Sequence, residues 1–80
     1  MPYDEYPQFA GYGTKAMICI IEDARLSRTD QEIALGRLVE HRDYADIAAQ
    51  LHRDRSGVSK RLRHIIIPHL MDYIARHDRA

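Results

Sequence analysis

The chain has little of what several classes of protein require. Its 80 residues include one cysteine, Cys19, so no disulfide can form within the chain and a reducing compartment is expected. Its longest apolar run is far shorter than the roughly 20 residues of a membrane span, and its first residues lack the basic and apolar regions of a signal peptide. We therefore expect a cytoplasmic protein with no membrane contact, in which Cys19 is a small buried apolar residue.

The patterns of metal sites and catalytic sites are also missing. No two of the five histidines are three or four residues apart and no pair of cysteines accompanies them, so the spacing does not indicate a zinc site. Ser56 and Ser59 lie among basic residues, without an acid and a histidine that the sequence places beside them. The sequence therefore predicts no metal ligand, no cofactor, no catalytic residue and no enzymatic activity.

A net charge of zero conceals an uneven distribution. Residues 1–50 contain nine acidic and five basic residues, whereas residues 51–80 contain three acidic and seven basic ones. Five of the basic residues fall within residues 52–64, with one acid. Cations beside serine and glycine suit a polyphosphate surface, because short side chains let a helix approach while Arg and Lys reach phosphates and base edges. Charge alone is more typical of a solvated surface helix.

Apolar residues recur at the three- and four-residue spacing of an α-helix in four segments. Residues 16–21 could also form a buried strand, but the sequence offers no second strand to pair with it. We therefore predict an all-α domain of about four helices. Their apolar positions are, in order, Met17, Ile20, Ile21 and Ala24; Ile33, Leu35, Leu38 and Val39; Tyr44, Ile47, Ala48 and Leu51; and Val58, Leu62, Ile65, Ile66 and Leu70.

Polar residues predict where the helices begin. Thr14 is expected to cap the first helix, which reaches about residue 25. Thr29 and Glu32 are expected to form a capping box at the second. Asp43 is expected to cap the third, and the fourth begins near Asp54 or residue 56.

Pro68 falls inside the last helix, and proline removes a helical hydrogen bond and clashes with the preceding turn. We expect a kink near Ile67 and a continuation to about residue 76. The apolar stripe beyond the kink either packs on the first helix or forms a homodimer seam. Residues 1–13 are predicted to be an extended or flexible arm before a domain at residues 14–80. Aromatic residues of the arm either cover the core or form a docking motif; they are Tyr3, Tyr6, Phe9 and Tyr12.

The order of residue types in residues 43–63 is similar to the helix-turn-helix of the fourth region of bacterial sigma factors and of LuxR-type regulators. In those families an apolar-Ala pair and a Leu anchor the first helix, and a Val and a Leu anchor the recognition helix. The matching residues here are Ile47, Ala48, Leu51, Val58 and Leu62. The resemblance covers about residues 29–66. Where the families usually have Gly and an apolar residue after the Leu, this chain has His52 and Arg53, which predicts a wider or differently shaped turn.

The resemblance implies a sequence-specific DNA-binding transcriptional regulator of bacterial, phage or mobile-element type. Its recognition helix would enter the major groove of double-stranded DNA. Bases or phosphates would be met by Arg55, Ser56, Ser59, Lys60 and Arg63, and the backbone would be flanked by Arg53 and Arg61. RNA polymerase and a second copy, bound through the C-terminal helix, are further expected partners. The alternative is a protein-interaction module that binds polymerase, an anti-sigma protein or a phage assembly partner without DNA.

Overall fold

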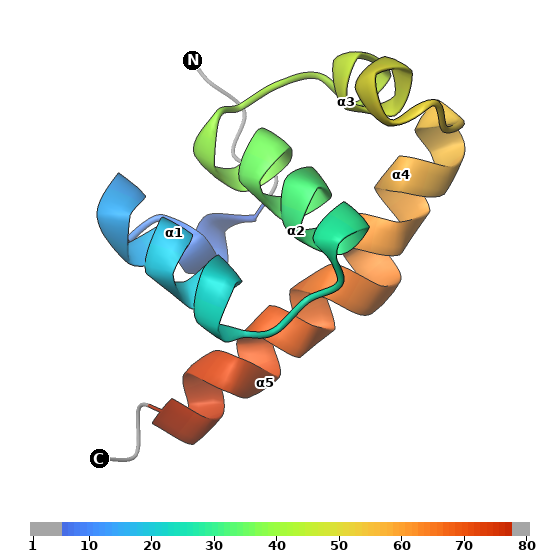
Figure 1. The fold of residues 1–80 in the computed structure, drawn as a ribbon. Coiled ribbons are helices and arrows are strands. Elements are labelled where there is room, and N and C mark those ends of the chain that lie inside the picture. Colours follow the sequence, from blue (N-terminus) through green and yellow to red (C-terminus); the bar gives the residue numbers. More distant parts are fainter. Residues whose placement is uncertain (1–5, 78–80) are drawn as a thin grey trace.

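The computed structural model describes residues 6–77, and every regular element in this range is helical (Figure 1). In chain order the elements are the 3-10 helix η1 (Pro7–Phe9), α1 (Thr14–Asp23), α2 (Arg28–Ala34), the π-helical turn η2 (Leu35–Val39), α3 (Tyr44–Leu51), α4 (Arg55–Arg61), the π-helical turn η3 (Leu62–Ile66) and α5 (Ile67–His77). Because η2 continues α2, and η3 joins α4 to α5 without a break, these elements form four longer helical segments. The prediction of an all-α domain of about four helices is confirmed. None of the helices within residues 6–77 has the length and apolarity needed to cross a membrane.

The segment made by α4, η3 and α5 is the long axis around which the other helices pack (Figure 1). The first helix, α1, lies against α5 and η2, while α2 lies against η3. At the other end of the axis, α3 packs on α4 and η2. The last helix therefore packs on the first helix of the same chain, which is one of the two arrangements that the sequence left open.

One apolar core joins these elements, and most of the predicted apolar positions lie in it. Phe9 is buried there, and Tyr6 and Tyr12 are half-buried against it, so these aromatic residues cover the core as one interpretation expected. Tyr3 lies outside the described residues. The buried apolar residues are Phe9, Met17, Ile21, Ala24, Ile33, Ala34, Ile47, Ala48, Val58, Leu62, Ile66, Ile67 and Leu70.

Three apolar residues lie differently from their predicted places. Cys19 is exposed, because it is two positions from both Met17 and Ile21 and so lies on the opposite side of α1 from the core. Ile65 is 47% exposed, whereas the next two residues along the chain are buried. Leu51 is half-buried against the core.

The beginning of α2 corrects the predicted capping box. Ser27 is the N-cap, and its hydroxyl oxygen accepts a hydrogen bond of 3.2 Å from the backbone N–H of Asp30. A capping box needs a hydroxyl residue followed three positions later by an acid, and the sequence offers this pattern twice, at residues 27 and 30 and at residues 29 and 32. The structure uses the earlier one. Thr29 therefore lies inside the helix, and the carboxylate of Glu32 instead pairs with Arg28 at 3.8 Å.

The other predicted caps are only partly as expected. Gly13, rather than Thr14, is the N-cap of α1. Asp43 and Asp54 occupy the N-cap positions of α3 and α4, but neither side chain makes a capping hydrogen bond. Their carboxylates still lie at the positively polarised ends of these helices.

The helical course does not break at Pro68, which lies in the first turn of α5. The irregularity lies in the turn before it, where the N–H of Ile67 donates to the carbonyl of Leu62, five residues earlier. A π-helical turn is wider than an α-helical turn, which gives room where a proline ring would meet the preceding carbonyl. The wider turn also shifts the register, so that Ile66 and Ile67 face the core and Ile65 faces solvent.

Gly36 and Arg42 fix the corner between η2 and α3. A Cβ atom on the buried Gly36 would lie 3.1 Å from Cγ1 of Ile47, so the missing side chain allows the two helices to approach closely. Nη1 of Arg37 donates to the carbonyl of Arg42 at 3.0 Å, and the Arg42 guanidinium donates to Oε1 of Gln50 in α3. Packing and hydrogen bonds together hold α3 where it can support α4.

Candidate nucleic-acid interface

The connection between α3 and α4 is a tight turn of three residues, 52–54, rather than a wider one. His52 has a φ of 57° and therefore takes the left-handed conformation for which glycine is the usual residue. The N–H of Arg53 donates to the carbonyl of Ala48 at 2.8 Å, and the N–H of His52 donates to that of Ala49 at 3.3 Å. These two bonds form a Schellman motif, which satisfies the last carbonyls of α3.

One side of α4 faces the core and the other faces solvent. Val58 and Leu62 are buried, and they belong to the same apolar core as Ile47 and Ala48 of α3. Lys60 follows Ser56 by four positions and precedes Arg63 by three, so these residues share the outward side of the helix. All three are exposed. Gly57 is also exposed, and a Cβ atom added to it would meet nothing within 4 Å.

Four cations on and beside α4 are free of acidic partners. Arg53, Arg55, Lys60 and Arg63 are exposed, and within residues 6–77 none of them forms an ion pair. Three arginines elsewhere in residues 6–77 are paired: Arg28 with Glu32 at 3.8 Å, Arg42 with Glu40 at 3.9 Å and Arg76 with Asp72 at 3.1 Å. The α4 surface therefore offers positive charge that the described chain does not neutralise.

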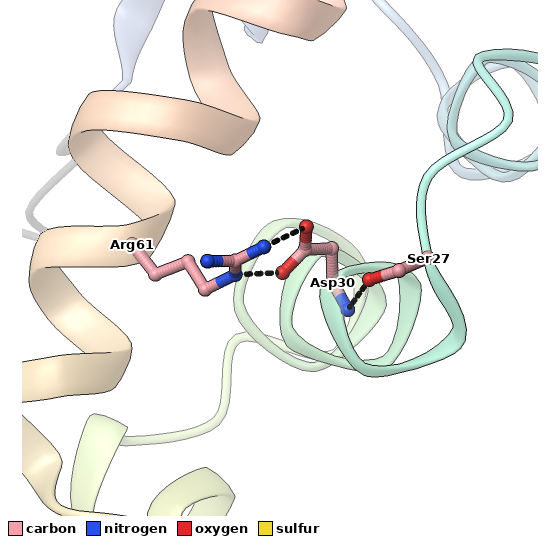
Figure 2. A network of polar contacts seen from close by, with 3 residues as sticks. All are labelled: Ser27, Asp30 and Arg61. Carbon is pink, nitrogen blue, oxygen red and sulfur yellow. Dashed lines mark hydrogen bonds and ion pairs between the residues drawn. The ribbon is translucent and has the colours of Figure 1, made fainter.

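Arg61 differs from these four cations, although it belongs to the same basic segment. Figure 2 shows its guanidinium directed at Asp30 of α2, where Nε binds Oδ1 and Nη2 binds Oδ2 at 3.0 Å. The hydrogen bond and the charge of Asp30 raise the pKa of Arg61 above its ordinary value. The Arg61 side chain is 41% exposed, whereas that of Asp30 is 6% exposed.

A shallow groove of about 470 Å³ runs along α4 and the turn before it. Arg53 and Asp54 line one end, and His64 and the exposed Ile65 line the other. Gly57 and Lys60 lie between them. Val58 and Arg61 also line the groove, so it combines cations with a larger share of apolar surface.

A second hollow, of about 540 Å³, lies at the opposite end of the long axis between the end of α1 and α5. The Tyr73 hydroxyl donates to Asp23 at 3.2 Å, and Nε2 of His69 lies 2.6 Å from the carbonyl oxygen of Ala24. Burial, followed by the hydrogen bond to Asp23, raises the pKa of Tyr73. The described part of the chain contains no group of three or more potential ligands that could hold a metal ion. This hollow joins two helices and has no cluster of one charge.

Six of the seven predicted interface residues lie together on or beside α4 without a bond to α2, while the seventh, Arg61, is held by Asp30. Five of the six are exposed and Ser59 is half-buried. Sequence reasoning missed Asp30, because it is 31 residues from its partner and belongs to a separate helix. One sequence signal could have identified Asp30. It lies three positions before Ile33, and therefore on the side of the helix that faces the core.

No protein-family model, no curated protein and no solved structure matches the chain.

Proposed function

We propose that this protein binds double-stranded DNA sequence-specifically and regulates transcription, with α3 and α4 acting as a helix-turn-helix. The observation that carries the proposal is the group of four exposed cations on and beside α4 that have no acidic partner within residues 6–77. A duplex supplies phosphates for such cations, and the exposed Ser56 and Gly57 leave room for a groove edge near the helix.

Two of these cations, Arg55 and Arg53, lie at different places relative to α4, and we expect different roles for them. Arg55 is the first residue of α4, the end of a recognition helix from which side chains reach base edges. An arginine can donate two hydrogen bonds to guanine, a contact worth about 1–3 kcal/mol of discrimination. Arg53 lies in the turn and is suited to a phosphate. Ser59, Lys60 and Arg63 extend the contact along the helix.

Selection of bound duplexes from a random pool identifies the preferred site, and titration of labelled duplexes then tests the roles. We expect Arg55→Ala to weaken the preferred duplex far more than a scrambled one. Arg53→Ala should weaken both about equally and reduce the salt slope by about one. Arg28→Ala, which removes an exposed arginine from α2, is the matched control and should change neither affinity. Equal losses on both duplexes would reject Arg55 as a base reader.

A protein-interaction module is the second candidate function, and two exposed apolar residues favour it. Ile65 is 47% exposed beside the groove, and Met71 is 39% exposed on α5. Such residues are typical anchors at protein interfaces, where methionine is enriched. Failure of the parent protein to bind any duplex at low salt would reject DNA binding and leave this candidate.

A further inference from the structure

Asp30 is the one buried charged side chain within residues 6–77, with 4% of the residue exposed. A carboxylate that loses its water needs a partner, because an unpaired buried charge costs several kcal/mol in a protein interior. Two features of α2 itself help to hold Asp30 in place. Its backbone N–H is bound to Ser27, and it lies in the first turn of α2, where the helix dipole favours an anion (Figure 2).

Arg61 supplies that partner from α4 with two parallel hydrogen bonds. The paired arrangement of Nε with Oδ1 and Nη2 with Oδ2 restrains direction as well as distance, which a single point charge would not. The contact joins two helices through residues that are 31 positions apart in the chain. It lies one residue before the fully buried Leu62, so it acts where α4 meets the core.

The apolar contacts of α4 place one side of the helix against the core, and the ion pair adds a directional restraint on its rotation. Val58 and Leu62 are 1% and 0% exposed, but the hydrophobic effect that buries them is non-directional. A rotation of α4 by about 20° would move the tips of its side chains by about 2 Å, given a helix radius of roughly 5–6 Å with side chains. Such a displacement is large beside the tolerance of about 0.5 Å that a binding geometry allows.

We propose that Arg61 is a positioning residue which, through Asp30, fixes the rotation of α4 and thereby the aim of its outward face at the bases. This inference rests on the proposed DNA-binding function. It makes Asp30 a determinant of specificity, although Asp30 lies on α2, which is not the recognition helix. It also commits Nε and Nη2 of Arg61 to Asp30 and not to a phosphate. A phosphate that took over its guanidinium would leave Asp30 buried without a partner.

A double variant separates positioning from folding. Asp30→Leu with Arg61→Met replaces a partly buried ion pair by apolar side chains of similar size, and proteins often tolerate such a change even at fully buried pairs without loss of stability. Circular dichroism and urea unfolding establish that the variant is folded. We expect the ratio of its affinities for preferred and scrambled duplexes to fall on the order of tenfold, because the reading side chains are misplaced. Its salt slope should equal that of the parent protein, because no phosphate contact is lost.

Arg61→Lys provides a second test that keeps the charge. Lysine can pair with Asp30 as a point charge but cannot form two parallel bonds, so the specificity ratio should fall while the salt slope is retained. Lys60→Ala is the matched control from the adjacent position. It removes a cation of the outward face, and its salt slope should fall by about one.

The outcomes distinguish this inference from the function on which it rests. A specificity ratio equal to that of the parent protein in both Arg61 variants, or a salt slope reduced by about one in the folded double variant, overturns the positioning role and leaves DNA binding in place. A parent protein that binds no duplex overturns the proposed function, and the inference with it. A lowered ratio at an unchanged slope supports the inference.

Discussion

His52 ends α3 with a φ of 57°, in the left-handed region that residues with a Cβ atom enter at a cost of about 1–2 kcal/mol. The backbone bonds of the Schellman motif require this conformation, and they do not depend on the side chain. The free-energy cost therefore arises because residue 52 has a Cβ atom. The hydrogen bonds of the turn do not contribute to it. A glycine at this position would avoid the cost, because it has no Cβ atom.

We expect His52→Gly to stabilise the protein. Relief of the left-handed conformation is offset by the greater freedom of glycine in the unfolded chain, which leaves a gain of about 0.5–1 kcal/mol. Ala49→Gly, on the same helix at an exposed position, is the control and should lose about 1 kcal/mol. Urea unfolding of both variants measures the difference. Destabilisation of similar size in the two would mean that the His52 side chain stabilises the turn.

Tyr73 links α5 to α1, and the direction of its pKa shift predicts how the stability of the protein responds to alkaline pH. Burial and the bond to Asp23 raise its pKa above the usual 10.0, so the folded chain holds the phenol proton more tightly than the unfolded chain does. Its contribution to stability is complete below about pH 10 and is lost as pH rises through the folded pKa. The Tyr73→Phe variant has no phenol proton at this position, so it does not show this loss of stability. Urea unfolding between about pH 9 and 11 should show a shallower decline of stability in this variant than in the parent, and equal declines would contradict the assignment.

At the scale of the element, the π-helical turn η3 decides which residues of the long axis face the core. An unbroken α-helical register predicts Ile65 and Ile66 on the apolar side, whereas the structure buries Ile66 and Ile67. The shift allows η3 to pack on α2 while α4 packs on α3 and α5 packs on α1.

Two substitutions test that register. Leu62→Ala removes a fully buried side chain and should cost about 2–5 kcal/mol, a large part of the stability of a small domain. Ile65→Ala removes an apolar side chain of similar size that is half exposed and should cost less than about 1 kcal/mol. Thermal or urea unfolding ranks them. If Ile65→Ala costs more stability than Leu62→Ala, then Ile65 lies in the core and the register shift assigned to η3 is wrong.

The elements also show where sequence reasoning succeeds. Helices and their apolar faces follow from three- and four-residue spacing, which is why Ile21, Ile47 and Leu62 are buried where expected. The start of α2 was missed because two capping frames overlap, and local sequence does not rank them. The pair of Asp30 and Arg61 was missed because it is a tertiary contact, which no local pattern encodes. The exposed cations of α4 were predictable, because they lie opposite a regular apolar stripe.

At the scale of the whole molecule, the number of available cations predicts the salt dependence of binding. With Arg61 held by Asp30, four cations remain on and beside α4. If each neutralises one phosphate, the logarithm of the binding constant falls with the logarithm of salt concentration by no more than about 3.6 per bound copy. Titrations at several salt concentrations, with the number of bound copies measured by sedimentation, test this limit. A steeper slope per copy would mean that cations outside the α4 surface also contact DNA.

The unneutralised cations have a further consequence because the chain as a whole carries no net charge. A positive face on a neutral molecule must be balanced by a negative remainder, so the protein is an electric dipole. A polyanion does not attract such a molecule from afar, but it turns the positive end inward once the two are within about a Debye length, roughly 8 Å at physiological ionic strength. The charge division therefore orients the molecule during an encounter, and it does little to raise the frequency of encounters.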